Sequence, residues 1–177
     1  MIPKNIYRAW QTQTFHKKVE KRIKKTIRIN KEYSHVIFTE PQRDDFVYAN
    51  FEGSITEAYQ QLNNVVAKVD LWRYLIIYKH GGVYLDMDAS IERPISTFIS
   101  DDDQAVISAE TNENLFLQWA LFYTKEEAMA KEKMKGMELG KGKPSCLHLL
   151  DTSLPNPRPL HQYSELTRLR HQAFLNQ

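Results

Sequence analysis

The stretch GGVYLDMDAS, residues 81–90, follows two glycines with a short apolar run and then places two aspartates, Asp86 and Asp88, one residue apart. A strand points residues i and i+2 to the same face, so the two carboxylates would converge. Two negative charges at such a short distance repel each other unless a cation binds between them. Mg²⁺ and Mn²⁺ suit this place, because they take oxygen ligands from one or two carboxylates and from phosphate. An Asp-x-Asp pattern by itself is more often two solvated side chains in a turn. The surrounding sequence therefore has to distinguish a metal site from such a turn.

The preceding residues predict a helix that leads directly into this stretch. Asn63 or Asn64 can cap its start, the helix runs to about residue 79, and Gly81 stands where a helix-ending glycine belongs. Asp70 and Arg73 share one face of this helix. A second face carries a stripe typical of core contacts, formed by Val65, Val69, Trp72 and Ile76.

Strands and helices alternate along the N-terminal half of the chain. Residues 2–10 have the pattern of an opening strand, residues 17–30 that of an amphipathic helix, and residues 35–39 that of a second strand, ended by Glu40 and Pro41. This order predicts an α/β fold with a mostly parallel central sheet. Residues 83–85 would then form a short buried strand that delivers the two aspartates to its C-terminal edge, where open α/β sheets bind ligands.

The rest of the chain is less regular. Residues 105–108 are expected to form a strand and residues 113–135 a long helix that includes Leu117, Leu121 and Met129. Glycine and proline become frequent after residue 135. We therefore expect a catalytic domain over residues 1–135 and a short or truncated C-terminal segment, partly linker, over residues 136–177.

Composition indicates a globular protein. Of the 177 residues, 42% are hydrophobic and 26% charged, and the formal net charge is +2. The single cysteine, Cys146, excludes an internal disulfide framework and is compatible with a reducing compartment. No signal-peptide pattern and no run of about 18 apolar residues is present, so a cytoplasmic protein is expected.

Basic residues gather in the predicted helix near the N-terminus. Such a run is usually a solvated helix face, and the alternative is a surface that binds anionic lipid or nucleic acid by charge. We expect no nucleic acid partner, whereas peripheral contact with an anionic membrane is compatible with either an enzyme or a binding protein. Only Glu20 opposes the cations in this window, which are Lys17, Lys18, Lys21, Arg22, Lys24, Lys25, Arg28 and Lys31.

Residues 66–90, VAKVDLWRYLIIYKHGGVYLDMDAS, resemble the DXD-containing family of retaining glycosyltransferases that use nucleotide sugars. This family includes yeast initiating α-1,6-mannosyltransferases and capsular polysaccharide sugar transferases, and is distantly related to the clostridial glucosylating toxins. Its pattern is an acidic residue, two spacers and an arginine, followed by Gly-Gly-x-Tyr-x-Asp-x-Asp. The opening IPKNIYRAW also resembles the family, and the similarity extends over residues 2–110. The resemblance implies a GT-A-type, Rossmann-like nucleotide-sugar-binding domain.

The resemblance assigns a role to each aspartate of the pair. Asp88 resembles the direct ligand of Mn²⁺ or Mg²⁺, and Asp86 the residue that contacts the metal shell and the ribose or sugar of the donor. Arg73 completes the expected catalytic set, because a cation suits contact with phosphate.

Other residues resemble contacts of the nucleoside diphosphate sugar. Asp70 and Arg73 match a pair that holds the hydroxyls of the transferred sugar, Trp10 an aromatic platform for the base, and Tyr84 a second contact near the donor. Each has a purely structural alternative. Asp70 and Arg73 have the spacing of a helical ion pair, and Trp10 is equally compatible with the core.

The reaction implied is transfer of a hexose to an acceptor hydroxyl on a glycan, a polysaccharide or a lipid-linked sugar, with retention of anomeric configuration. No residue separates UDP from GDP donors or one hexose from another. After about residue 115 the resemblance fades, and no equivalent of the family's late metal-site and diphosphate residues is evident. A catalytically incomplete donor-binding protein is therefore an alternative.

A second enzymatic alternative starts from DMDAS, residues 86–90, which approximates the Asp-x-Asp-x-Thr motif of haloacid-dehalogenase-type phosphatases. Asp86 would then be a covalent nucleophile and Asp88 a general acid, with Ser90 in place of threonine. That fold needs a second acidic pair much later in the chain. Asp101 and Asp103 come too early to supply it.

Overall fold

The computed structural model describes residues 1–12, 14–106 and 118–125, and these residues form one mixed sheet with helices on both faces. The strand order is β2-β1-β3-β5-β4. Strand β1 pairs in parallel with β2 and β3, whereas β5 is antiparallel to β3 and β4. Four of the five described strands therefore run in one direction, which confirms the predicted α/β class. The strands are β1 (Asn5–Ala9), β2 (Ser34–Phe38), β3 (Gly82–Leu85), β4 (Ala105–Val106) and β5 (Ala120–Tyr123).

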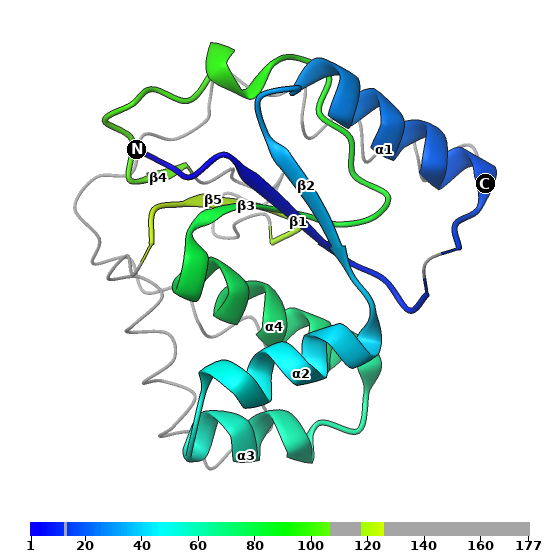
Figure 1. The fold of residues 1–177 in the computed structure, drawn as a ribbon, viewed down its shortest axis with the longest axis vertical. Helices are drawn as coiled ribbons and strands as arrows, with labels where there is room; N and C mark the ends of the chain where they lie inside the picture. Colours follow the sequence, from blue (N-terminus) through cyan, green and yellow to red (C-terminus); the bar gives the residue numbers. More distant parts are fainter. Residues whose placement is uncertain (13, 107–117, 126–177) are drawn as a thin grey trace, which may run out of the picture.

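The helices divide between the two faces of the sheet, as Figure 1 shows. Helix α1 (Lys17–Ile29) covers one face, while α2 (Glu40–Asn50) and α4 (Val65–His80) lie on the other, with α3 (Ser54–Gln61) beyond α2. None of these described helices is long and apolar enough to cross a membrane.

Alternate residues of the central strands face opposite layers, as strand geometry requires. Tyr7 and Tyr84 belong to the core cluster on the α4 side, whereas Ile6 and Leu85 belong to the cluster on the α1 side. Arg8, one residue after Tyr7, lies on the α1 side, where its guanidinium contacts Thr26 of α1. The side chains of the candidate site described below approach β3 from both layers.

Helix α4 has the start and the end that its sequence predicts. The side chain of Asn64 accepts a hydrogen bond of 2.8 Å from Val66 N, and Gly81 follows the last helical residue with φ +64°. The sequence predicted that one apolar stripe of this helix contacts the core. In the structure the contact is wider, because every residue from Leu71 to Ile77 is buried. Residues 71–77 lie between the sheet and α2 and so have no solvent face, whereas His80 at the end of the helix is exposed.

Two predictions fail in the described residues. Residues 120–123, expected to be helical, form β5. The strand was not predicted because the run ALFY is buried at all four positions and so lacks the alternation of apolar and polar residues that identifies a strand. Helix α2 begins where Glu40 and Pro41 are predicted only to end a strand. Thr39 and Gln42 form a capping box there, and proline fits a first helical turn. Residues 113–117, 126–135 and the predicted segment 136–177 lie outside the described residues.

Gly82 permits the close approach of β3 to β1, which gives a test of the fold. A Cβ at Gly82, where φ is +99°, would lie 2.8 Å from Asn5 O, whereas a Cβ at Gly53, with φ +61°, would meet open space. Each alanine substitution forces a backbone conformation that costs about 1 to 3 kcal/mol. Only Gly82→Ala also displaces the neighbouring strand, at a further cost of about 1 to 3 kcal/mol. We predict a clearly larger loss of unfolding free energy in urea for Gly82→Ala than for Gly53→Ala. Equal losses would contradict the close approach.

Candidate active site

The acidic pair lies in a turn at the carboxyl end of β3. The strand ends at Leu85, and residues 86–89, here named the aspartate turn, are closed by a hydrogen bond of 3.1 Å from Ala89 N to Asp86 O. Delivery of the pair to the strand end is confirmed, but the argument from strand alternation is wrong for Asp88, because the chain turns after Asp86. Asp86 is half-buried, and Asp88 is exposed.

The carboxylate of Asp86 is held on the α4 side of the sheet. The hydroxyl of Tyr84 donates to Asp86 Oδ1 at 2.7 Å, and Arg73 Nη2 lies 3.8 Å from the same oxygen. Arg73 also forms an ion pair with Asp70, and its Nη1 donates to Gln118 O at 2.7 Å. The Arg73 guanidinium lies 4.9 Å from the centre of the Tyr84 ring. One buried cation thus joins α4, the end of β3 and the residues that lead into β5.

Burial affects the ionisation of both groups that contact Asp86. Burial by itself lowers the pKa of Arg73, but the negative charges of Asp86 and Asp70 favour the cation, and the net pKa is raised. Burial raises the pKa of Tyr84 well above its usual value. The phenol therefore stays protonated and remains a donor, so Asp86 Oδ1 receives a hydrogen bond and faces a cation at neutral pH.

Trp10 lies at the same edge of the sheet. It follows the last residue of β1, and parallel pairing with Tyr7 opposite Tyr84 brings the ends of β1 and β3 together. Trp10 N donates to Phe38 O at 3.0 Å, and Trp10 O accepts from Arg43 Nη1 at 2.7 Å, which fixes its backbone. Trp10 is 36% exposed, so its ring is not enclosed by the core.

Four of the six predicted site residues are in direct contact, namely Asp70, Arg73, Tyr84 and Asp86. Trp10 and Asp88 lie at the same edge and keep exposed surface. The helical pairing of Asp70 with Arg73, the structural alternative, is present, and the contact of Arg73 with Asp86 is added to it. Tyr84 is only 1% exposed, and its hydroxyl is bound to Asp86.

Sequence reasoning missed two buried arginines at this edge. Arg8 is 2% exposed and donates from Nη1 to Asp86 O and, at 3.1 Å, to Ala89 O. Arg43 is 1% exposed and holds the carbonyls of Trp10 and Phe38. An arginine within the apolar strand residues IYRA was the available signal, because charged groups are buried only with partners.

The residues present fit a divalent cation that is shared with a phosphate ligand. Within the described ranges, no three histidine, cysteine, aspartate or glutamate side chains lie close enough to hold a metal by themselves. The aspartate turn contributes two carboxylates, one of them exposed, and Mg²⁺ is commonly bound by one or two carboxylates together with substrate phosphates and water. The donor set therefore suits Mg²⁺ or Mn²⁺ and does not resemble an all-protein cage.

A mostly parallel sheet with an acidic pair and an exposed aromatic ring at its carboxyl edge defines an α/β protein whose candidate site lies where open α/β sheets bind ligands. The chain belongs to the family described as "Glycosyltransferase sugar-binding region containing DXD motif", whose sequence model matches residues 16–111, more than half of the chain. The predicted family is confirmed. Both aspartates and Arg73 fall inside the match.

Curated relatives support the same family. The chain is 29% identical over 98 residues to the inositol phosphoceramide mannosyltransferase 3 of Schizosaccharomyces pombe, which covers 55% of this chain and 27% of the relative. It is also 29% identical over 108 residues to the initiation-specific alpha-1,6-mannosyltransferase of Candida albicans. This match covers 58% of this chain and 28% of the relative. The matched region thus spans little more than a quarter of these relatives.

A solved structure shows the same fold. The PaToxG glycosyltransferase superposes with a TM-score of 0.59 at 18% sequence identity, over 97% of this chain and 69% of that one. The structural likeness agrees with the GT-A-like architecture expected from the sequence. At this level of identity, the likeness concerns the fold alone.

The hydrogen bond between Tyr84 and Asp86 gives a test of the site. Tyr84→Phe removes a buried donor to a carboxylate, a bond typically worth about 1.5 to 3 kcal/mol. We predict a loss of that order in the free energy of unfolding, measured with urea. Tyr48→Phe is the matched control, because Tyr48 is 45% exposed and surface changes usually stay within about 0.5 kcal/mol. Equal effects of the two substitutions would contradict the role given to Tyr84.

Proposed function

We propose that the protein is a glycosyltransferase that moves a hexose from a nucleoside diphosphate sugar to an acceptor hydroxyl and depends on Mn²⁺ or Mg²⁺. The observation that carries this proposal is the family match across the aspartate turn, combined with the contacts of Asp86 at the carboxyl edge of the sheet. The family resemblance further implies retention of anomeric configuration.

Each site residue has a task in this proposal. Asp88, which is exposed, is the main ligand of the cation, and Asp86 completes the metal shell or contacts the ribose or sugar of the donor. When bound, the cation stabilises the negative charge that develops on the departing diphosphate. The ring of Trp10 supports the base at the same edge.

Arg73 has a more specific task than the sequence indicates. It is 7% exposed, and its terminal nitrogens already contact Asp70, Asp86 and Gln118 O. We therefore propose that Arg73 acts mainly through its neighbours, by orienting Asp86 toward the metal and Asp70 toward the sugar. Its buried charge also lies close to where the diphosphate would bind, and a low-dielectric environment strengthens that attraction.

The relatives suggest which substrates to test first. Both are named as mannosyltransferases, and one is named for an inositol phosphoceramide acceptor. We therefore propose mannose as the first hexose to test, with a glycan or lipid-linked acceptor. GDP and UDP donors both stay in the test, because the residues described do not separate them.

The phosphatase alternative has less support. The family match covers both aspartates, and Asp103, part of its second acidic cluster, accepts a hydrogen bond of 2.8 Å from Ser100 N within a local turn. Hydrolysis of a chromogenic phosphate that is lost in Asp86→Asn would restore this alternative.

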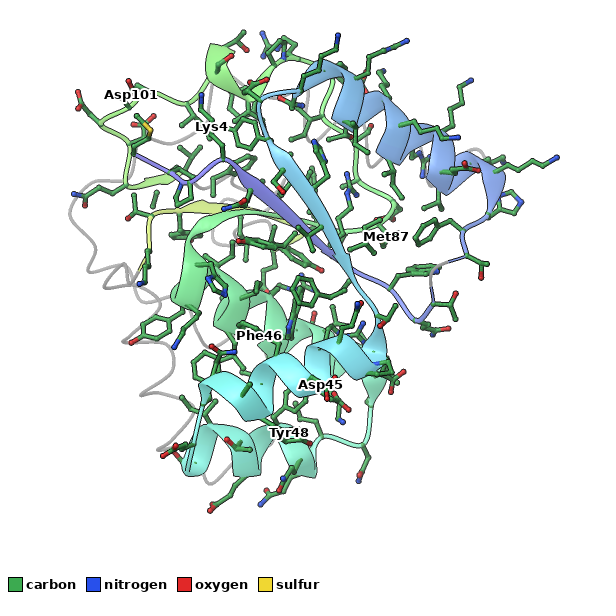
Figure 2. All side chains as sticks on the ribbon, viewed as in Figure 1. Lys4, Asp45, Phe46, Tyr48, Met87 and Asp101 are labelled. Carbon is green, nitrogen blue, oxygen red and sulfur yellow. The ribbon has the colours of Figure 1, made fainter. Side chains whose placement is uncertain are left out.

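Calorimetry with UDP, GDP and their sugars, each with and without Mn²⁺, tests the proposed site. We predict that Mn²⁺ strengthens donor binding and that Asp88→Asn weakens the Mn²⁺-dependent binding at least about tenfold, which corresponds to about 1.4 kcal/mol. Asp45→Asn is the matched control, because Asp45 is an exposed aspartate on α2, away from the sheet edge in Figure 2. Tight nucleotide binding that is indifferent to metal would refute the proposal.

We also propose that the outer face of α1 contacts an anionic membrane that carries the acceptor. Lys17, Lys18 and Lys21 are exposed on this helix, and Ile27 adds an exposed apolar side chain. Helix α1 lies beside the aspartate turn, because Arg22 Nη1 contacts the backbone oxygen of the turn's third residue at 3.3 Å. A lipid headgroup on the outer face would therefore lie across the helix from the proposed donor site, at a distance of one helix diameter, ~10 Å.

Co-sedimentation with vesicles tests the membrane proposal. We predict binding to phosphatidylserine vesicles that weakens steeply with salt, and no binding to neutral vesicles. Each lysine near an anionic surface contributes about 1 kcal/mol, so the combined Lys17→Gln, Lys18→Gln and Lys21→Gln variant should bind at least about tenfold more weakly. Asp88→Asn should bind like the wild type. Unchanged binding by the triple variant would exclude this face.

A further inference from the structure

Arg8 is the most deeply buried cation beside the aspartate turn. It is 2% exposed, and its Nη1 donates to Asp86 O and to Ala89 O, which belong to the first and last residues of the turn. Its Nη2 lies 3.5 Å from the hydroxyl of Thr26 on α1. One guanidinium thus joins both ends of the turn to the strand beside it.

Burying a cation in a strand needs compensation. Desolvation lowers the pKa of Arg8 to about 10, although the charges of Asp86 and Asp88 act against this shift. The side chain is therefore still protonated at pH 7. The turn carbonyls cannot pair with a neighbouring strand, and buried carbonyls need donors. Arg8 and the turn satisfy each other.

Helix α1 gives the turn a second attachment. Arg22 Nη1 lies 3.3 Å from Asp88 O, and Thr26, which contacts Arg8, donates to Arg22 O at 3.1 Å. Three of the four residues of the turn therefore have their carbonyls bound by guanidinium groups. Met87, the fourth, is 5% exposed, and Figure 2 shows it beside the sheet, on the side where α1 lies.

We propose that Arg8 is a positioning residue that fixes the backbone of the aspartate turn, so that Asp86 and Asp88 present their carboxylates to a divalent cation in one arrangement. This inference rests on the metal-dependent function proposed above. A turn that is ordered before the cation arrives binds it more tightly than one that must be ordered on binding. Arg8 touches the backbone of the ligands and not the cation.

Two substitutions separate the geometry of Arg8 from its charge. Arg8→Lys keeps the charge but loses the planar fork, whose Nη1 donates to both turn carbonyls while its Nη2 contacts Thr26. Arg8→Gln loses both the charge and the fork. If Arg8 acted only by repelling the cation, Arg8→Gln would bind Mn²⁺ more tightly than the wild type. Our proposal predicts that both variants bind Mn²⁺ more weakly, by about 10- to 100-fold, the range found when residues that orient metal ligands are changed.

The measurement is Mn²⁺ binding to the full chain without nucleotide, followed by the electron paramagnetic resonance signal of free Mn²⁺. A second readout is hydrogen exchange at the amide of Ala89, which closes the turn on Asp86 O. Faster exchange at this amide is expected in Arg8→Lys, because the turn has lost the guanidinium that joins both of its end carbonyls to Thr26. If the wild type binds no Mn²⁺, the proposed metal site fails, while exchange at Ala89 still tests the hold of Arg8 on the turn.

Arg43→Lys is the matched control. Arg43 is also buried and also donates to two strand-end carbonyls, those of Trp10 and Phe38, but it does not contact the aspartate turn. Its replacement is expected to lower the free energy of unfolding and leave Mn²⁺ affinity within about twofold of the wild type. The reason is that substitutions at sites that share no contacts act independently of one another. A loss of Mn²⁺ affinity equal to that of Arg8→Lys would overturn the proposal.

A milder substitution covers the case in which the Arg8 variants do not fold. Arg22→Gln removes the donor to Asp88 O from a half-buried side chain, so folding should persist. It is expected to weaken Mn²⁺ binding severalfold and to speed exchange at Ala89. Wild-type values for both readouts in Arg22→Gln, or wild-type Mn²⁺ affinity in folded Arg8→Lys, would overturn the proposal.

Discussion

Asp86 is held from both faces of the sheet, and the arrangement of the site depends on this. Its carboxylate contacts Tyr84 and Arg73 on the α4 side, and its carbonyl contacts Arg8 on the α1 side. Such a double hold is possible because β3 lies inside the sheet, with a helix above and a helix below. The residue that leaves the strand first is therefore the best oriented residue of the pair, whereas Asp88 gains exposure by lying further along the turn.

Buried arginines serve a common purpose at the carboxyl edge. Strand ends leave carbonyls without ladder partners, and Arg8, Arg43 and Arg73 donate to carbonyls at the ends of β3, β1 and β2 and before β5. Arginine suits this task because its guanidinium donates to two acceptors at once, as Nη1 of Arg8 and Nη1 of Arg43 do, and its charge persists when desolvated. Positive charge is consequently fixed beneath the edge at which a diphosphate is proposed to bind.

Local signals in the sequence predicted the elements next to the candidate site. Contacts between residues far apart in the sequence could not be predicted from it. Asn64 and Gly81 mark the two ends of α4 with side-chain and backbone chemistry that acts within a few residues, and both ends are confirmed. The run ALFY carries no such signal, because burial on both sides removes alternation, and β5 was missed. Arg8 lies 78 residues from Asp86, so its role becomes visible only once β1 pairs with β3. The spacing of Asp70 and Arg73 indicated their pairing, but the link to Asp86 required α4 to pack on the sheet.

The two sides of helix α1 carry different groups. Its outer side carries the lysines, and its inner side carries Arg22 and Thr26, which contact the aspartate turn and Arg8. A helix of 13 residues is about 20 Å long and moves nearly as a rigid rod. A small tilt imposed from outside would therefore displace the backbone atoms that carry the two acids. Substitutions that shift the helix, such as changes at the buried Ile23, would therefore also displace the aspartate turn, so the outer surface of α1 and the proposed metal site are expected to change together during evolution.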